Sequence, residues 1–388
     1  FWKSTQESRS GGHTRAHLPQ AAMTDTNSRV HGVLVVDDSA FMRKLIAEMI
    51  DAHPDFRVVG IARDGVDAMT QIVRLDPDIV TLDLEMPKLD GLMVLRRVMT
   101  ESPRPVVVLS AGGAQYGDAT LRALELGAVD FVRKPSGPVS LDLPIVRERL
   151  IAALGAAARA RLAPPPVVLE REVSTVPLAP LQNRGAATHV VVIASSTGGP
   201  RALAEIVPQL PAALSAAVVI AQHLPAEFTG ALAERLARAS TVCVREADDG
   251  MPLLAGAVYI ARGGVNTSIA SSGAGEGGAA VLRQHPAAAR SGATPCADVL
   301  FSSAAEVFGA ACTGVVLTGM GRDGAAGLRN IRSGGGRAII QDEPSSAIYG
   351  MPRAALLEAG ADRVVSLTMM ASAIIGMVPE ERLEWLTA

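Results

Sequence analysis

The sequence predicts an α/β protein with two parallel sheets, and two observations support this expectation. Short runs rich in Val and Ile alternate with helical stretches from Val33 onward, and the same alternation returns from His189. Between them, Pro-rich text such as APPPVV has no periodicity, which is typical of an extended linker. The first alternation fits a flavodoxin-like domain, and the second fits a larger, mostly parallel, doubly wound α/β domain.

The expected strands are short apolar runs bounded by turns. In the first domain they are VLVV, RVVGIA, DIVTLD, PVVVLS and VDFV, with helices expected over 40–52, 66–75, 91–101 and 118–127. In the second domain they are VVVIA, AAVVIAQ, TVCVRE, AVYIA, TGVVLTG, RAIIQD and RVVSL. The stretch over 262–292 is rich in Gly, Ser and Ala and predicts a hairpin with a loose tip.

With 388 residues the chain is long enough for two domains that each bury a core. We expect a disordered N-terminal extension over 1–29, a first domain over 30–136, a linker over 137–187 and a second domain over 188–384. The linker opens with an Ala- and Arg-rich helical stretch, RERLIAALGAAARARL.

The composition argues against several classes of partner. A net charge of −3 and an aromatic content of 3% give neither a basic surface nor stacking rings for nucleic acid. No apolar run is long enough to span a bilayer and no signal peptide is recognisable, so we expect a cytoplasmic protein that is not inserted in a membrane. Cys243, Cys296 and Cys312 lie too far apart for a zinc motif and are expected to be small buried hydrophobes.

Charged and polar residues follow the strands of the first domain. Asp37 and Asp38 follow the first strand, Asp83 ends the third, Ser110 ends the fourth and Lys134 follows the fifth. Carboxyl ends of parallel strands meet at one sheet edge, so these side chains should share a pocket. Clustered carboxylates repel unless a cation offsets them, and hard oxygen ligands suit Mg²⁺. One carboxylate could then attack a phosphoryl group, although a lone Asp at a strand end often only caps a helix.

The joint pattern VVDDSAFMRK, TLDLEMPKLDG, VVVLSA and FVRKP resembles the response-regulator receiver domains over residues 33 to 135. This resemblance implies that Asp83 is the phosphoacceptor and that Asp38 and Asp83 hold the metal, with Asp37 supporting. It also implies that Ser110 and Lys134 form the switch pair.

Three residues of the second domain suggest nucleophilic catalysis. Ser196 lies in ASSTGGP, His223 in QHLP and Asp323 in GMGRDG, and each follows a predicted strand. If these strands are parallel, the three side chains converge at one edge. A Ser hydroxyl needs an imidazole to take its proton, and the imidazole needs a carboxylate to fix its tautomer. Each residue alone could instead be a helix cap or a hydrogen-bonded strand end.

Backbone donors should lie beside Ser196. Thr197, Gly198 and Gly199 open a predicted helix, and the free N–H groups at a helix start could form an oxyanion hole.

Seven segments of the second domain, taken in order, resemble the catalytic domain of the CheB protein-glutamate methylesterases. They are ASSTGGP, AQHLPAEFTGALAERL, EADDGMPL, YIARGG, PCADVLFSSAA, VVLTGMGRDGAAGL and GMPRAAL. The resemblance covers most of residues 188 to 380 and implies that Ser196 is the nucleophile. It further implies that His223 is the general base and Asp323 its orienting carboxylate, with Thr197 and Met320 lining the site.

The chain departs from the family pattern at two places. The usual Gly-Ala-Ser-Thr is Ala-Ser-Ser-Thr at 194–197, and the usual Arg-Pro-Ser is Thr-Pro-Cys at 294–296. Ser195 is therefore a rival nucleophile, although the register against Thr-Gly-Gly favours Ser196.

The resemblance implies hydrolysis of glutamyl methyl esters on methylated chemotaxis receptors, and deamidation of receptor glutamines at the same site. The esterase needs no cofactor, whereas the receiver needs Mg²⁺ for phosphorylation. The resemblance also implies a chemotaxis histidine kinase as phosphodonor, with an unphosphorylated receiver covering the esterase site until phosphorylation loosens the contact.

Two other functions fit parts of the sequence. A dinucleotide-binding protein would use Gly319, Gly321 and Gly324, which spell GxGxxG between a strand and a helix, with Asp342 ending the next strand. That interpretation leaves Ser196 and His223 without a role. Alternatively, the receiver regulates an esterase-like interaction module, or an esterase, of a non-chemotaxis pathway.

Overall fold

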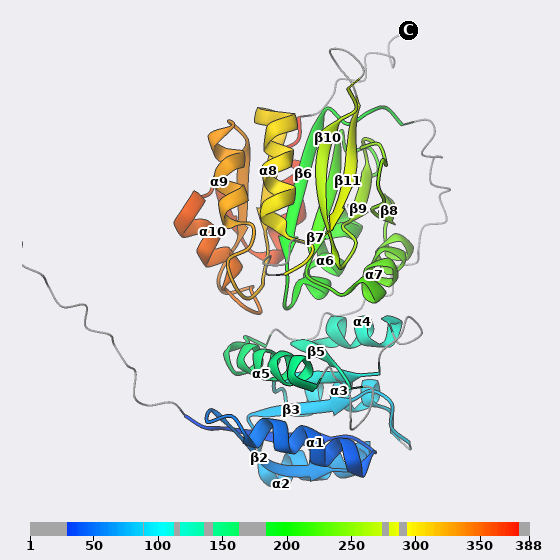
Figure 1. Ribbon diagram of the computed structural model, residues 1–388, viewed down its shortest axis with the longest axis vertical. Helices are drawn as coiled ribbons and strands as arrows, with labels where there is room; N and C mark the ends of the chain where they lie inside the picture. The colour runs from blue at the N-terminus through cyan, green and yellow to red at the C-terminus, as the bar shows by residue number, and fades with distance from the viewer. Residues whose placement is uncertain are drawn as a thin grey trace, which may run out of the picture.

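The computed structural model describes residues 29–87, 89–111, 117–135, 143–162, 184–273, 279–286 and 293–379. The predicted N-terminal extension lies outside the described residues except for Arg29, as does most of the predicted linker. The chain forms two α/β domains stacked along the long axis of the molecule (Figure 1), with the first domain in blue through cyan to blue-green and the second in green to red.

The first domain contains a five-stranded sheet in the order β2-β1-β3-β4-β5, and all its pairs are parallel. Every residue of β3 and β4 is buried, because helices cover both faces of the sheet. The predicted flavodoxin-like arrangement is confirmed. The strands are β1 (His31–Val36), β2 (Phe56–Ala62), β3 (Ile79–Asp83), β4 (Val106–Ser110) and β5 (Asp130–Arg133).

Two helices cover one face of this sheet and three cover the other. Side chains of α1 and α5 share a core with Val33 and Val35, whereas α2, α3 and α4 pack on the side of Leu34 and Val36. The alternation of these inward directions along β1 is the two-residue period of a strand. The helices are α1 (Ala40–Asp51), α2 (Gly65–Leu75), α3 (Gly91–Glu101), α4 (Gly117–Leu126) and α5 (Leu143–Arg159).

Helix α5 corrects the expected boundary at residue 136. The composition of this segment predicts a linker, but the helix packs against β5, β4 and α1. Leu150, Ala153 and Leu154 are each at most 3% exposed. The buried face of this helix was not recognisable in the Ala-rich sequence, because small side chains give only a weak contrast in hydrophobicity between the two sides of a helix.

The second domain contains a seven-stranded parallel sheet in the order β14-β13-β12-β6-β7-β9-β8. The predicted larger, mostly parallel sheet is therefore confirmed. The hairpin expected within 262–292 is also present, as β10 (Val265–Ser271) paired antiparallel with β11 (Ala280–Pro286). The sheet strands are β6 (His189–Ser195), β7 (Ala216–Gln222), β8 (Cys243–Glu246), β9 (Ala257–Ile260), β12 (Cys312–Val316), β13 (Arg337–Gln341) and β14 (Arg363–Val365).

Helices cover both faces of the second sheet as well. Side chains of α6, α7 and α11 pack with Val191 and Ile193, and those of α8, α9 and α10 pack with Val190 and Val192. This is the doubly wound arrangement. The helices are α6 (Gly199–Ile206), α7 (Ala226–Ala239), α8 (Ala297–Phe308), α9 (Ala325–Ser333), α10 (Met351–Ala359) and α11 (Leu367–Ile375).

The two domains meet through α4, β5 and α5 of the first and the lower end of the second (Figure 1). Helix α4 packs against α7, and the rings of Phe131 and Phe228 lie 4.7 Å apart at this contact. Around the rings, Arg235 pairs with Asp118 at 3.0 Å and with Glu125. An apolar centre with an ionic rim is the usual composition of a specific interface.

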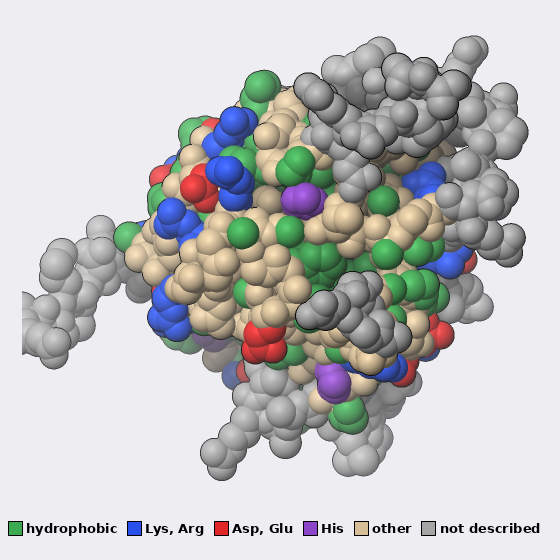
Figure 2. All heavy atoms as spheres, turned by 90° about the horizontal axis from the view of Figure 1, so that it is seen from above, with side chains coloured by type: hydrophobic (Ala, Val, Ile, Leu, Met, Phe, Trp, Pro, Cys, Tyr) green, Lys and Arg blue, Asp and Glu red, His purple; other side chains and the backbone are tan. Residues whose placement is uncertain are grey.

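The end of the second domain that faces away from the first carries a mixed surface. Lys, Arg, Asp and Glu side chains of the described residues are interspersed there with apolar ones (Figure 2). Within the described part of the chain, no helix is both long and apolar enough to cross a membrane.

We predict that Leu154→Ala destabilises the first domain by about 2–5 kcal/mol, because it removes a fully buried side chain from the core. The exposed Ile145 of the same helix provides the control, and Ile145→Ala should change stability by less than about 0.5 kcal/mol. Native-state hydrogen exchange of β1 and β4 amides in the full chain measures the difference. Equal exchange in the two variants would mean that α5 is not part of this fold.

Candidate active site

Ser196 occupies a tight turn between β6 and α6. Its N–H donates to Thr318 O (3.1 Å), and its own carbonyl accepts from Gly199 N (2.8 Å). Gly198 has φ +78°, and a Cβ there would lie 2.7 Å from Ala347 Cβ. A residue without a side chain is therefore needed at this turn, which presents Ser196 at the carboxyl edge of the sheet.

Gln222, the last residue of β7, holds the nucleophile turn against the neighbouring strand. Its Nε2 donates to the carbonyl oxygens of Ser196 (3.0 Å) and His223 (3.2 Å). Its Oε1 accepts from Ser195 Oγ (2.7 Å). Ser195 is 0% exposed, so its hydroxyl is committed to this contact and out of reach of substrate. The structure therefore favours Ser196 over its rival.

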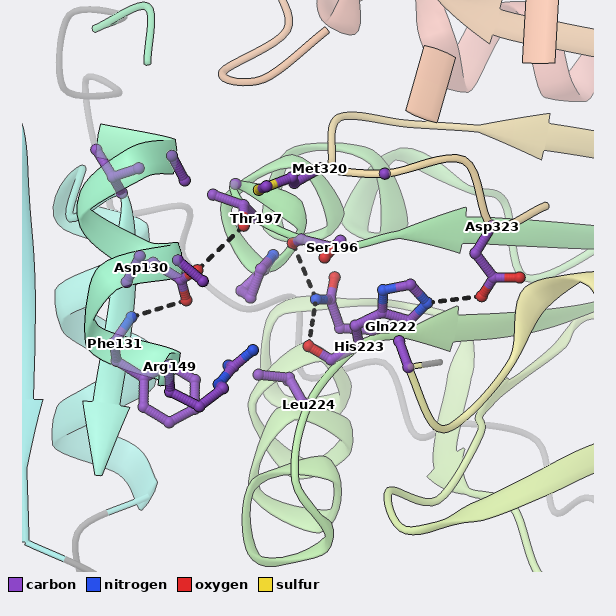
Figure 3. Close-up of a pocket in the computed structure, with 18 of the residues that line it drawn as sticks. Asp130, Phe131, Arg149, Ser196, Thr197, Gln222, His223, Leu224, Met320 and Asp323 are labelled. Carbon is purple, nitrogen blue, oxygen red and sulfur yellow. Dashed lines mark hydrogen bonds and ion pairs between the residues drawn. The ribbon is translucent and has the colours of Figure 1, made fainter. Parts of the chain in front are cut away.

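His223 follows β7 directly and is held at both ends. Its N–H donates to Ser195 O (3.0 Å), and its Nε2 donates to Asp323 Oδ2 (2.8 Å). Because a carboxylate only accepts, Nε2 carries a proton in this bond, and Nδ1 is the ring nitrogen that has the lone pair in a neutral imidazole. Nδ1 is the ring nitrogen on the Ser196 side (Figure 3).

Asp323 lies in the turn between β12 and α9, and several groups donate to it. Its Oδ2 accepts from Ala297 N (2.7 Å), and its Oδ1 accepts from Asp298 N and Gly324 N (both 3.0 Å). Burial raises the pKa of Asp323, but the hydrogen bonds from His223 and from the amides of Ala297 and Asp298 outweigh it, so the net pKa is lowered. The side chain is therefore a carboxylate at the N-terminus of α8, where a negative charge is favoured.

Cys296 adds a thiol to this carboxylate. Its Sγ donates to Asp323 Oδ1 at 3.3 Å. Burial and the charge of Asp323 raise the pKa of Cys296 to about 11, so the thiol stays protonated and acts as a donor. The expectation that Cys296 is a buried hydrophobe is wrong, because the residue is only partly buried and lines the active-site cavity.

The catalytic candidates line a cavity of about 500 Å³. Ser196, Thr197, His223, Met320 and Asp323 all border it (Figure 3). Among the described residues, no hydrogen bond joins Ser196 Oγ to His223. Such bonds are often long in enzymes without substrate and tighten when the substrate binds.

Two of the three predicted oxyanion donors are available. Gly199 N already donates to Ser196 O, so this predicted donor is used within the turn. The amides of Thr197 and Gly198 remain as the candidates, at the start of α6.

Residues of the first domain also enter this cavity. Asp130 and Phe131 of β5 and Arg149 of α5 line it opposite Ser196 (Figure 3). Thr197 Oγ1 donates to Asp130 Oδ2 at 3.1 Å. No pattern in the sequence predicts this contact, because it depends on how two separate sheets dock.

The acid cluster of the first domain forms a second site. One oxygen each of Asp37, Asp38 and Asp83 lies within 4.8 Å of the others, which suits a divalent cation. Lys134 Nζ lies 2.7 Å from Asp37 Oδ2 and 2.7 Å from Asp83 Oδ2. The structure thus brings together four of the residues predicted for this pocket.

The charge balance of this pocket is set by burial and by Lys134. Burial raises the pKa of Asp83 to about 6, although Lys134 opposes the shift. Burial lowers the pKa of Lys134, but its hydrogen bonds to Asp37 and Asp83 outweigh this effect, so the net pKa is raised. Ser110 Oγ lies 2.7 Å from Thr120 Oγ1 of α4, which links the end of β4 to the helix at the domain interface.

The GxGxxG segment serves the active site. A Cβ on Gly319 would lie 2.7 Å from Ser196 Cβ and 2.4 Å from Met351 Sδ, so this glycine allows the turn to approach the nucleophile. Asp342 Oδ1 accepts from Ser345 N (3.1 Å) and Ser345 Oγ and is used within its own loop. The use of Asp342 Oδ1 within its own loop, together with the absence of a role for Ser196 and His223 in that interpretation, argues against dinucleotide binding.

Comparison with known proteins identifies both domains. Residues 191–374 match the family described as CheB methylesterase, and residues 33–145 match the response regulator receiver domain. The protein-glutamate methylesterase/protein-glutamine glutaminase of Symbiobacterium thermophilum is 42% identical over 372 residues, which covers 92% of this chain and 100% of that protein. This chain belongs to the CheB methylesterase family. The protein of the same description from Geobacillus kaustophilus is 42% identical, over 90% of this chain and 99% of that one.

One solved structure is similar to part of this chain. The CheB methylesterase catalytic domain of Thermotoga maritima is 35% identical, with a TM-score of 0.47 over 49% of this chain and 98% of that one. Hereafter the first domain is called the receiver and the second the esterase domain.

Gln222 was not among the predicted site residues, although a polar residue at the end of a buried strand beside His223 is a signal for such a role. We predict that Gln222→Leu lowers the free energy of unfolding of the esterase domain by about 1–3 kcal/mol, because buried polar groups lose their partner. Gln209→Leu, at an exposed glutamine, should have little effect. Thermal unfolding followed by circular dichroism compares them, and equal midpoints would contradict the assigned role.

Proposed function

We propose that this chain acts in the cytoplasm as a phosphorylation-regulated protein-glutamate methylesterase. Its substrates are glutamyl methyl esters of chemotaxis receptors, and glutamines of the same receptors are deamidated at the same site. The observation that carries this proposal is the joining of Ser196, His223 and Asp323 at one cavity in a chain 42% identical over its length to proteins of that description.

The first half of the reaction forms an acyl-enzyme. His223 Nδ1 removes the proton from Ser196 Oγ, and Oγ attacks the ester carbonyl carbon. The developing oxyanion accepts hydrogen bonds from the amides of Thr197 and Gly198. The tetrahedral intermediate collapses, the C–O bond to the methoxy group breaks, and the proton on His223 leaves with methanol.

The second half regenerates the enzyme. A water gives its proton to His223 Nδ1 and attacks the acyl carbon, and Ser196 leaves with that proton, which releases the glutamate side chain. For a glutamine substrate the first leaving group is ammonia instead of methanol. Throughout, the bond from Nε2 to the Asp323 carboxylate (2.8 Å) fixes the tautomer and stabilises the imidazolium.

In the receiver, Asp37, Asp38 and Asp83 would hold Mg²⁺. Two observations support the fit: the donors are all carboxylate oxygens, and they lie within 4.8 Å of one another. The metal would neutralise charge on an incoming phosphoryl group. Asp83 then accepts the phosphoryl group from a chemotaxis histidine kinase. Lys134, whose Nζ lies 2.7 Å from Asp83 Oδ2, balances the added negative charge.

Phosphorylation would release the receiver from the esterase cavity. Ser110 is bonded to Thr120 of α4, and α4 packs against α7 of the esterase domain. If the Ser110 hydroxyl turns toward a phosphoryl group on Asp83, it gives up Thr120, and the α4 contact is weakened.

We predict that Ser196→Ala lowers methanol release from methylated receptor membranes by at least about 1,000-fold, because the nucleophile is lost. Ser195→Ala is the matched control and should stay within about tenfold of the wild type, since it loses one buried hydrogen bond. The opposite ranking of the two variants would make Ser195 the nucleophile.

We predict that a small phosphodonor with Mg²⁺ raises the methanol release of the full chain by at least about fivefold, which is the lower end of typical coupling between sites. Asp83→Ala removes the acceptor and should show no increase, and chelation of Mg²⁺ should abolish the increase in the wild type. An equal response in the wild type and in Asp83→Ala would rule out this regulation.

A further inference from the structure

We propose that Asp130 of the receiver occupies the subsite that binds the carboxyl group of the substrate, so that the receiver inhibits the esterase as a tethered analogue of its product. The inference rests on the proposed function, because hydrolysis of a glutamyl ester leaves a side-chain carboxylate. Aspartate presents the same group on a side chain one methylene shorter.

The topology places Asp130 at the esterase cavity. It is the first residue of β5, the edge strand of the receiver sheet, so one side of its strand has no neighbouring strand. Its Oδ2 accepts from Thr197 Oγ1 at 3.1 Å, and Thr197 directly follows Ser196. In Figure 3 the Asp130 carboxylate points toward Thr197 from across the cavity.

The two carboxylate oxygens have separate partners. Asp130 Oδ1 accepts from Phe131 N at 2.8 Å, which fixes the side chain relative to its own strand. Oδ2 is thereby left to project from the receiver toward Thr197. A product carboxylate in this place would accept the same hydrogen bond, and an ester carbonyl oxygen could accept it as well.

Asp130 differs from the other carboxylates of the domain interface in its charged neighbours. Asp118 and Glu125 pair with Arg235 at the rim, whereas within the described chain Asp130 has no ion pair. Burial raises the pKa of Asp130, against the positive charge of Arg149 and the hydrogen bonds from Phe131 and Thr197. Geometry carries the argument: the group that receives this carboxylate is the hydroxyl of Thr197 beside the nucleophile, as expected if the cavity is built to receive carboxylates.

The surrounding contacts fix how Asp130 enters. The Phe131 and Phe228 rings pack at 4.7 Å, and Arg133 pairs with Glu227 at 3.5 Å. Both contacts lie on β5 or directly against it, so they hold the strand whose first residue is Asp130. The docked receiver therefore presents one carboxylate at one position beside Ser196.

The first test is Asp130→Ala in the full, unphosphorylated chain. We expect its basal methanol release from methylated receptor membranes to rise about tenfold, because a hydrogen bond to a charged group in the docked form is lost. We also expect faster hydrogen exchange of the α4 and α7 amides, since docking is weakened. Asp51→Ala, which removes the same charge from the far end of α1, should change neither measurement.

The second test asks whether a free carboxylate replaces the missing one. Acetate at tens of millimolar should restore the α4 and α7 protection of Asp130→Ala and lower its basal rate again, whereas chloride at the same ionic strength should not. Restored protection excludes simple competition at an open site, because a competitor would leave the domains apart. No effect of acetate beyond chloride would overturn the proposal and leave Asp130 an ordinary contact.

A third variant tests the Thr197 side of the hydrogen bond, and only domain docking is measured, by amide exchange. Thr197→Val removes the donor, so it should speed the same amide exchange, and adding it to Asp130→Ala should give little further change. Additive effects would contradict a shared bond.

Phosphoramidate, which releases no acetate, serves as the activating phosphodonor. If phosphoramidate elicits no methanol release from the wild type, the proposed function fails. If the activated wild type releases methanol but the basal rate of Asp130→Ala equals that of the wild type, only this inference is overturned.

Discussion

Asp323 joins three segments that lie far apart in the sequence. Its carboxylate accepts hydrogen bonds from the imidazole of His223 in the loop after β7, from the first amides of α8, and from the amide of Gly324 in its own turn. A carboxylate with so many donors is both charged and immobile, and this is what a general base needs from its partner. The start of α8 and the orientation of the imidazole are therefore fixed by one group. Removing that group would disturb structure and chemistry together.

Much of the fold followed from local pattern. The apolar runs predicted every strand of both sheets, because burial on both faces of a sheet leaves a continuous apolar run in the sequence. The β10–β11 hairpin was predicted from a different signal, the Gly-rich composition of its segment. Helix α5 was the exception. Its buried side is made largely of alanines such as Ala153 and Ala157, so the text resembled a linker although Leu150 and Leu154 complete the core.

The site was predictable where one domain supplies all the parts. Residues at the carboxyl ends of parallel strands had to meet, which placed Ser196, His223 and Asp323 together, and likewise Asp37, Asp83 and Lys134. Their roles remain predictions. The sequence pattern could not predict contacts that depend on domain docking or on exact hydrogen-bond geometry, such as the Thr197–Asp130 bond and the thiol donor of Cys296. Gln222 did carry a signal, as a polar residue at the end of a buried strand, but its hydrogen bonds to the nucleophile turn follow only from the structure.

The short strand β5 connects the two sites of the molecule. Asp130 begins it inside the esterase cavity, and Lys134 directly follows it in the acid pocket, about 13 Å away at the usual rise of a strand. Because successive side chains point to opposite faces, gaining or losing a single residue here would turn one of the two away from its site. The length of this strand therefore ties the position of the acid pocket to that of the esterase cavity.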